Sequence, residues 1–371
     1  MSVPGAPDWS ILDIDPLQQI VTDADAYVRT LMQWHFGAET GTPFWLRRRA
    51  ELDFDPLTDV KSVEDLAQFP NVVDEFRDIA AEDLVPRGLG DSPKIAAIFE
   101  SGGTTGRPKR FVMFEDWFTR YLAWAGRKAA SGLGGSGINL LATTPSGPHM
   151  IGEVTVRQSH ALGGKRFTID IDPRWVKKLI ERGQTDELRA YVDHLVDQTA
   201  DVLATQDIGM IQTIPILLAK IAERPELVDL VRSKVKRIAW GGAHMDPDTR
   251  AILREEVFPG IPIVGGYGST TILSVAVERK EEQPSGLATF DPFSPYVFFR
   301  VVDPETSRPV AHGERGQIVM NHITKFAFIP NNLERDTAIR VPAEAGHIGD
   351  AVADVAPVKT FDGTNITEGV Y

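Results

Sequence analysis

Short apolar runs alternate with longer amphipathic segments from about residue 95 onward, and this alternation restricts the possible folds more than any other feature. The runs that read as strands are Ile95–Phe99, Ile138–Thr143, Val202–Thr205, Arg237–Trp240, Pro262–Gly265, Val297–Val302 and Gly316–Asn321. The segments that read as helices are Glu115–Ala130, Pro173–Arg182, Thr185–Thr199, Ile214–Glu223, Pro225–Ser233 and Pro247–Val257. Strands that alternate with helices predict an α/β protein with parallel strand pairing in its central part.

The two ends of the chain differ from this middle part. Residues 10–85 read as helical and irregular, whereas the last third is rich in Pro and Gly and reads as β-rich. We therefore expect layered α/β sheets with flanking helices. The expected parts are a mainly helical segment (1–90), an α/β core (91–285), a β-rich subdomain with a hinge-like segment (286–355) and a tail (356–371).

Composition excludes several classes of function. The net charge of −13 and the lack of a Lys/Arg stripe disfavour general nucleic-acid binding, which needs a basic face. The chain has no cysteine, which excludes disulfides, zinc–thiolate sites and a cysteine nucleophile. No stretch is long and apolar enough for a membrane span, and the N-terminus lacks the regions of a signal peptide. These features favour a cytoplasmic enzyme with no membrane partner.

The segment Ser101–Arg110 follows the first apolar run and has the composition of a phosphate-binding loop. Its glycines allow close approach of backbone N–H groups to an anion, its hydroxyls add donors, and its lysine adds a mobile positive charge. The residues concerned are Ser101, Gly102, Gly103, Thr104, Thr105, Gly106 and Lys109. The alternative interpretation is a polar surface turn between a strand and a helix.

Two further strand ends are rich in glycine. Arg237–Trp240 leads into Gly241–Pro247, and Pro262–Val264 leads into Gly265–Thr271, which contains Tyr267. Ligands of open α/β sheets bind beyond the carboxyl ends of the strands. Either segment alone could be a plain turn, but the series of three favours a nucleotide site.

The three segments resemble motifs of the adenylate-forming superfamily of acyl-CoA synthetases and adenylation domains. Ser101–Arg110 resembles the phosphate loop [ST]SG[ST]TGxPK, and Gly265–Thr271 is similar to YG[MS]TE. His312–Val319 resembles the GExGE segment, and Gly241–Pro247 resembles the GAEP-type turn of the phenylacetate–CoA ligase branch. The resemblance implies the large domain of these enzymes and covers residues 95 to about 355.

The resemblance also implies a reaction, in which a carboxylic acid attacks the α-phosphate of ATP to give an acyl-adenylate and pyrophosphate. Lys109, Thr270 and Arg335 would act in this step. The ribose is held in the family by the Asp of an RTGD-like segment, for which Asp336 is favoured over Asp350. The full expected ATP site is Ser101, Gly102, Gly103, Thr104, Thr105, Gly106, Lys109, Gly242, Ala243, Gly266, Tyr267, Gly268, Ser269, Thr270, Asp336 and Asp350.

The expected acyl pocket suits an aryl acid such as a hydroxy- or aminobenzoate. The residues expected to border it are His149, Gly241, Gly242, His244, Gly265 and Thr271. The acceptor stays open between CoA, a small amine and a hydroxyl, the last as in benzoxazole-type assembly in a biosynthetic pathway. Homodimers are frequent in this branch, but the sequence establishes no oligomeric state.

Two departures from the family pattern matter. The acidic residue that ends YG[MS]TE and supports Mg²⁺ is Thr271 here, so the metal would be held through water, by ATP alone, or by another acid such as Glu278. The sequence ends at Tyr371, without the family's mobile lid domain after the hinge; either that domain was removed or the enzyme works without it. A nucleotide-binding relative without catalysis, and an unrelated phosphate-binding enzyme such as a kinase, remain as alternatives.

Overall fold

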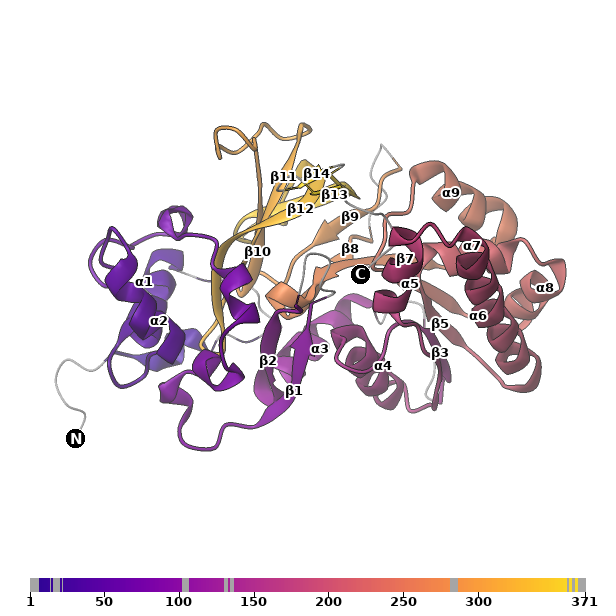
Figure 1. The fold of residues 1–371 in the computed structure, drawn as a ribbon, viewed down its shortest axis with the longest axis horizontal. Helices are drawn as coiled ribbons and strands as arrows, with labels where there is room; N and C mark the ends of the chain where they lie inside the picture. The colour runs from indigo at the N-terminus through magenta and orange to yellow at the C-terminus, as the bar shows by residue number, and fades with distance from the viewer. Residues whose placement is uncertain are drawn as a thin grey trace.

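A mixed sheet joins the middle of the chain to its C-terminal part (Figure 1). The computed structural model describes residues 7–13, 15, 21, 23–101, 107–129, 133, 137–280, 286–358, 360–361 and 364–365. Within these residues the sheet has eleven strands in the order β10-β11-β12-β13-β9-β8-β7-β6-β5-β3-β4. The parallel half of this sheet consists of β3 (Leu140–Thr143), β4 (Arg166–Ile169), β5 (Met210–Thr213), β6 (Arg237–Gly241) and β7 (Ile263–Ser269). The predicted α/β class with parallel central strands is therefore confirmed.

Helices connect these parallel strands. Because each crossover carries the chain back along a helix, the carboxyl ends of β6 and β7 meet at the same edge of the sheet. The connecting and flanking helices are α3 (Glu115–Ala129), α4 (Met150–Ala161), α5 (Pro173–Glu181), α6 (Thr185–Thr205), α7 (Pro215–Ala222), α8 (Pro225–Lys234) and α9 (Pro247–Ile252). Figure 1 shows α6, α7, α8 and α9 together at one end of the molecule.

The C-terminal part of the chain is β-rich, as the sequence predicted, and its strands pair antiparallel. Its larger strands are β8 (Ser274–Glu278), β9 (Thr289–Asp291), β10 (Val297–Val302), β11 (Arg315–Ile323), β12 (Phe328–Pro342) and β13 (Asp350–Pro357). Two short strands, β14 (Thr360–Phe361) and β15 (Thr364–Asn365), pair with each other. Because β8 pairs with both β7 and β9, the parallel and antiparallel halves share one sheet.

The N-terminal segment packs against the C-terminal strands. It contains α1 (Ala24–Phe36), α2 (Pro43–Arg48) and short 3₁₀ turns, among them Glu64–Gln68 and Val73–Arg77. The buried Trp45 donates its indole N–H to the Phe328 carbonyl, and the two rings lie 5.3 Å apart. Short helices such as these are only marginally stable by themselves, so burial of aromatic side chains against the sheet supplies most of the stability of the segment.

One predicted strand is wrong. Val202–Thr205 is the last turn of α6, and the strand of this region is β5, five residues further on. Leu203 is fully buried and continues the apolar face set by Leu195 and Thr199 at helical spacing. The short apolar run was compatible with either structure, and its periodicity with the preceding helix decides the outcome.

Candidate active site

A cavity of about 1240 Å³ opens at the carboxyl ends of β6 and β7. Its walls come from α3, α4, β8, β12, β13 and the base of the hairpin formed by β1 (Ile95–Glu100) and β2 (Arg110–Phe114). The sequence predicted a ligand site at the ends of these same two strands. Most of the predicted site residues border this cavity, as the following contacts show.

The turn after β6 forms one wall. Gly242 has φ = +79°, a conformation that side chains rarely adopt, and a Cβ at Gly241 would lie 2.8 Å from the Gly266 carbonyl oxygen. The His244 Nδ1 donates to the Val355 carbonyl on β13 at 2.7 Å, so this nitrogen carries the proton and Nε2 is free of this contact. Glycine is therefore required for the backbone of this turn, while β13 fixes the imidazole.

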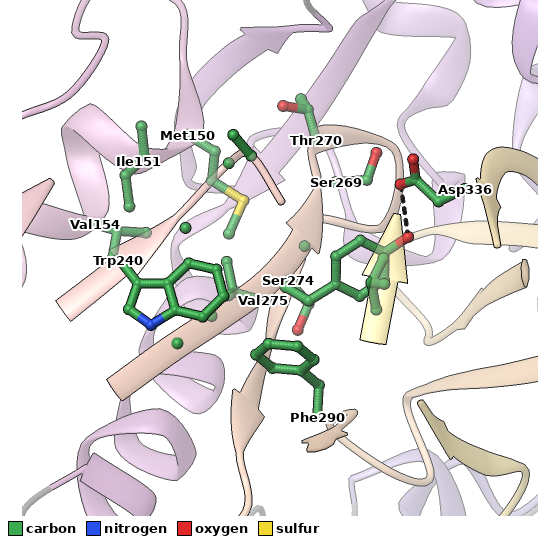
Figure 2. Close-up of a pocket in the computed structure, with 18 of the residues that line it drawn as sticks. Met150, Ile151, Val154, Trp240, Ser269, Thr270, Ser274, Val275, Phe290 and Asp336 are labelled. Atoms are coloured by element: carbon green, nitrogen blue, oxygen red, sulfur yellow. Dashed lines mark hydrogen bonds between the residues drawn. The ribbon is translucent and has the colours of Figure 1, made fainter. Parts of the chain in front are cut away.

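Tyr267 and Asp336 form the most strongly perturbed pair in the site. The Tyr267 hydroxyl donates to Asp336 Oδ2 at 2.9 Å (Figure 2). Burial raises the pKa of Asp336 to about 6, with a further increase from the Glu334 carboxylate. Burial and the Asp336 charge raise the pKa of Tyr267 well above 10. The pair is a phenol ring and an acceptor oxygen held side by side at the cavity wall, 69 residues apart in the chain.

A hydroxyl and carboxylate cluster lies next to this pair. Glu334 Oε1 accepts hydrogen bonds from Thr271 Oγ1 at 2.9 Å, Asn332 Nδ2 at 2.9 Å and Ser269 Oγ at 3.3 Å. The Gln317 amide donates to the Glu334 carbonyl at 2.7 Å. The motif position that lacks an acid, Thr271, is thus in contact with an acid from β12.

The base of the β1–β2 hairpin brings Lys109 to the cavity wall. Ser101 and Lys109 pair across the hairpin through a backbone hydrogen bond of 3.0 Å, and the Lys109 ammonium lies 3.0 Å from the Asp74 carboxylate. Arg77 also pairs with Asp74 at 2.8 Å and donates to the Arg107 carbonyl at 2.9 Å. The predicted loop residues Gly102, Gly103, Thr104, Thr105 and Gly106 lie outside the described residues.

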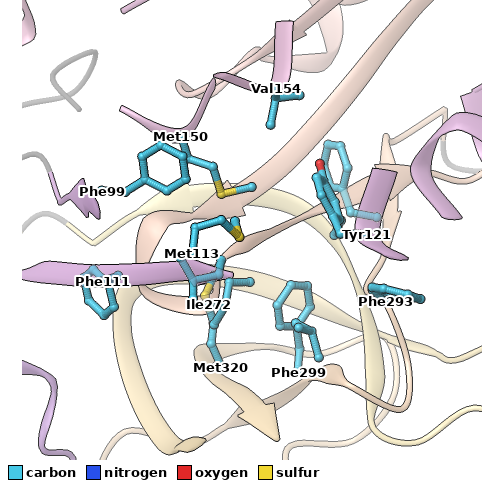
Figure 3. Close-up of a cluster of buried hydrophobic side chains, with 14 of the residues drawn as sticks. Phe99, Phe111, Met113, Tyr121, Met150, Val154, Ile272, Phe293, Phe299 and Met320 are labelled. Carbon is cyan, nitrogen blue, oxygen red and sulfur yellow. The ribbon is translucent and has the colours of Figure 1, made fainter. Parts of the chain in front are cut away.

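The hairpin is anchored in the hydrophobic core. Figure 3 shows Phe99, Phe111 and Met113 of the two strands in one cluster with Ile272 and Met320. All five side chains are almost completely buried. Ile272 directly follows the Thr271 position, so the core ties the hairpin to the tyrosine motif.

An apolar region of the cavity lies between the sheet and two helices. Tyr121 on α3, Met150 and Val154 on α4, and Val275 on β8 line it (Figure 2 labels the last three). Arg237, the first residue of β6, also lines the cavity, away from the carboxyl end of its strand, and burial lowers the pKa of its guanidinium. This part of the site has the apolar walls and few polar groups typical of small-molecule pockets.

Two predicted substrate residues have additional structural roles. A Cβ at Gly265 would lie 2.8 Å from the Trp240 ring and 2.9 Å from Phe290, so glycine is needed there for packing. His149 caps the start of α4 without a side-chain cap bond and lines the cavity; burial, followed by the nearby Arg174 charge, lowers its pKa.

Glu278, the alternative metal ligand named from the sequence, is already engaged. Its carboxylate pairs with Arg250 and accepts the Gly265 backbone N–H, and both charged side chains are about nine-tenths buried. Glu278 therefore has a structural role, in which it links β8 to β7 and to Arg250.

Comparison with known proteins agrees with the geometry of this cavity. Residues 187–324 match the family described as AMP-binding enzyme. The crystal structure of 2-hydroxyisobutyryl-CoA ligase in an open conformation, with 2-HIB-AMP and CoA, is similar over 95% of this chain and 80% of that chain. Its TM-score is 0.63 at 16% identity. Part of the chain therefore matches the AMP-binding enzyme family, and the chain shares the fold of an acyl-CoA ligase.

A second structure of the same ligase, in the thioesterification state, gives a TM-score of 0.64 at 17% identity. It is similar over 95% of this chain and 73% of that chain. At this identity the likeness establishes the fold of the large domain of adenylate-forming enzymes. No curated protein sequence matches the chain. No helix among the described residues is long and apolar enough to cross a membrane.

Most site residues expected of an adenylate-forming enzyme are gathered in the cavity. Those that line it are Ser101, Lys109, His149, Gly241, Gly242, Ala243, His244, Gly265, Gly266, Tyr267, Gly268, Ser269, Thr270, Thr271, Arg335 and Asp336. Asp350 is elsewhere: it is buried, pairs with Arg340 at 2.8 Å and accepts the Val301 N–H, so it does not border the cavity. Its position stabilises the C-terminal strands.

The sequence analysis missed Arg77 and the role of Glu334. Arg77 lies in an irregular segment with no motif, and no sequence signal places it near Lys109. Glu334 lies two residues before Asp336, the expected ribose carboxylate. Because the tyrosine motif has Thr271 in place of its usual acid, a nearby acid such as Glu334 could have been considered as a substitute.

Proposed function

We propose that this protein is an adenylate-forming enzyme that activates a carboxylic acid with ATP, forming an acyl-adenylate and releasing pyrophosphate. The observation that carries the proposal is that three kinds of group line one cavity. The Tyr267–Asp336 pair stands at one part of the wall, Lys109 at another, and the apolar surface of Met150 and Val154 opens between sheet and helix. An adenosine, a triphosphate and an acyl group each find matching chemistry there.

The nucleotide would be held by groups that the fold already fixes. The Asp336 carboxylate can accept hydrogen bonds from ribose hydroxyls, and the Tyr267 ring offers a flat surface to adenine. The Gly242–Ala243 backbone, which carries no large side chain, lines the cavity beside them. Ser101 and Lys109 provide a donor and a positive charge for the β- and γ-phosphates, in exchange for the present contact of Lys109 with Asp74.

In the chemical step, a carboxylate oxygen of the acid forms a bond to the α-phosphorus of ATP. The bond from that phosphorus to the bridging oxygen breaks, and pyrophosphate leaves with the electron pair. Negative charge on the phosphoryl oxygens is stabilised by the Lys109 ammonium, the Arg335 guanidinium and the Thr270 hydroxyl. Mg²⁺, when bound with ATP, neutralises further phosphate charge.

An aryl acid fits the acyl region best. Tyr121, Met150 and Val154 provide apolar walls against which a flat ring can pack. The acceptor of the acyl group is CoA, an amine or a hydroxyl; the predicted relation to the phenylacetate–CoA ligase branch favours none of them.

The test is pyrophosphate release by the purified chain with ATP and Mg²⁺ across matched panels of aryl and alkyl acids, first without CoA. Release that depends on one aryl acid is the expected result. Response to alkyl acids alone would contradict the aryl assignment while leaving adenylation intact. ATP binding without release for any acid would instead support a non-catalytic nucleotide-binding relative.

A further inference from the structure

The acid missing from the tyrosine motif has a counterpart on another strand. In the motif similar to YG[MS]TE, the position of the glutamate is Thr271. In the segment matched to RTGD, which ends at Asp336, the position of the threonine is Glu334. The acid and the hydroxyl have thus exchanged places between two segments that are 63 residues apart.

The exchanged residues touch. The Thr271 hydroxyl donates to Glu334 Oε1 at 2.9 Å, and Asn332 and Ser269 donate to the same oxygen. Within the described part of the chain, the hydrogen bonds to this carboxylate all end on Oε1. Glu334 lines the cavity, and none of these three hydrogen bonds uses its second oxygen.

A bulge in β12 produces this placement. Val319 pairs with Leu333 and Gln317 pairs with Thr337, so two residues on β11 span four on β12. Such extra residues leave the regular ladder and redirect side chains, a feature common beside active sites. The bulge contains Glu334, Arg335 and Asp336, and all three residues line the cavity.

We propose that Glu334 is the protein ligand of the Mg²⁺ that arrives with ATP, replacing the acid absent at position 271. The proposal rests on the ATP-dependent function given above. Mg²⁺ is held in nucleotide sites by one or two carboxylates together with phosphate oxygens and water, so a single glutamate suffices. A carboxylate beside a triphosphate repels it unless a cation lies between them.

The hydroxyl and amide donors at Oε1 then have a defined purpose. They hold the carboxylate in one orientation before the metal arrives, as the hydrogen-bond partners of metal ligands do. Thr271 thus acts as a positioning residue for Glu334, in the place where the family motif has the acid itself.

The experiment compares the affinity for ATP with Mg²⁺ and with EDTA by calorimetry, and the binding of Mn²⁺ with ATP by electron paramagnetic resonance. The variants are Glu334→Gln, the exchange Thr271→Glu with Glu334→Thr, and Glu305→Gln on an exposed loop as the matched control. Glu334→Gln is expected to weaken the binding of MgATP by at least about tenfold and to leave binding in EDTA unchanged or tighter. The exchange variant should restore metal-dependent binding.

Equal MgATP and Mn²⁺ binding by wild type and Glu334→Gln would overturn the proposal and leave Glu334 as a hydrogen-bond acceptor only. If Glu334→Gln does not fold, the exchange variant decides, because a folded exchange variant without metal-dependent binding also overturns it. Failure of the wild type to bind ATP under either condition would refute the proposed function itself, so the two failures are distinguishable.

Discussion

Two buried histidines should make the folding of this protein sensitive to acid. His35 on α1 and His322 on β11 are both completely shielded from solvent. His35 Nε2 donates to the Thr324 carbonyl at 2.7 Å, and its Nδ1 lies 2.8 Å from the Thr42 hydroxyl. His322 Nδ1 donates to the Ile272 carbonyl at 2.7 Å, and its Nε2 lies 2.8 Å from the Thr324 hydroxyl. Each ring therefore has one donating and one accepting nitrogen, which is the neutral form.

The expected magnitude follows from the two protonation states. Burial lowers the pKa of His35 to about 3 and that of His322 to about 4, from 6.5 in the unfolded chain. The stability that each neutral ring contributes is therefore present above pH 6.5 and is lost as the pH falls toward the folded pKa. At pH 5 both rings are still neutral in the folded state, whereas they are mostly protonated in the unfolded chain. Each ring therefore lowers the free energy of unfolding by about 2 kcal/mol between pH 7 and pH 5, and the two together lower it by about 4 kcal/mol.

The assay is urea denaturation at pH 7 and pH 5 of the wild type, His35→Gln, His322→Asn and the exposed His194→Gln. Each buried variant should reduce the pH 7 to pH 5 difference in unfolding free energy by about 2 kcal/mol, whatever its own stability at pH 7. His194→Gln should not reduce it. Asp336, whose raised pKa acts in the opposite direction, is common to all four proteins and cancels in the comparison. If His35→Gln and His322→Asn both showed the same difference in unfolding free energy between pH 7 and pH 5 as the wild type, the reasoning would be refuted.

Three further predictions concern the walls of the cavity. Glu278→Gln leaves the Arg250 guanidinium buried without its carboxylate, so urea denaturation should show a loss of about 3–5 kcal/mol; a loss below 1 kcal/mol would contradict the buried pair. Gly265→Ala places a Cβ 2.8 Å from an indole ring and should cost about 1–3 kcal/mol in the same assay, and an unchanged midpoint would be inconsistent with that packing. Tyr267→Phe keeps the ring and loses one hydrogen bond, so it should raise the KM for ATP less than Asp336→Asn does; the reverse ranking in steady-state kinetics would argue against a ribose carboxylate.

The glycine-rich turns that line the cavity could be found from the sequence because they belong to short continuous motifs. Parallel strands place their carboxyl ends at one edge, so the turns at Gly241 and Gly265 had to lie together once the α/β class was recognised. The resemblance selected Asp336 over Asp350, and the structure places only Asp336 at the cavity. These inferences needed no knowledge of side-chain packing.

The rest depended on contacts that sequence spacing does not reveal. The bulge that turns Glu334 toward Thr271 arises from the register between β11 and β12, which no local pattern specifies. The apolar wall formed by Met150 and Val154 looks, in sequence, like the buried face of any amphipathic helix. Arg77 is placed near Lys109 only by the packing of an irregular segment against the hairpin.

The two glutamates beside the tyrosine strand show why an acid near a nucleotide must be judged by its partners. The Glu278 charge is balanced by a buried guanidinium and a backbone N–H, so removing it from this pair to bind a metal would leave Arg250 uncompensated. The Glu334 hydrogen bonds come from two hydroxyls and an amide, which orient the carboxylate without neutralising it. Among the described residues, Glu334 accepts its side-chain hydrogen bonds from neutral donors, so its surroundings favour binding a cation together with the nucleotide more than those of Glu278 do.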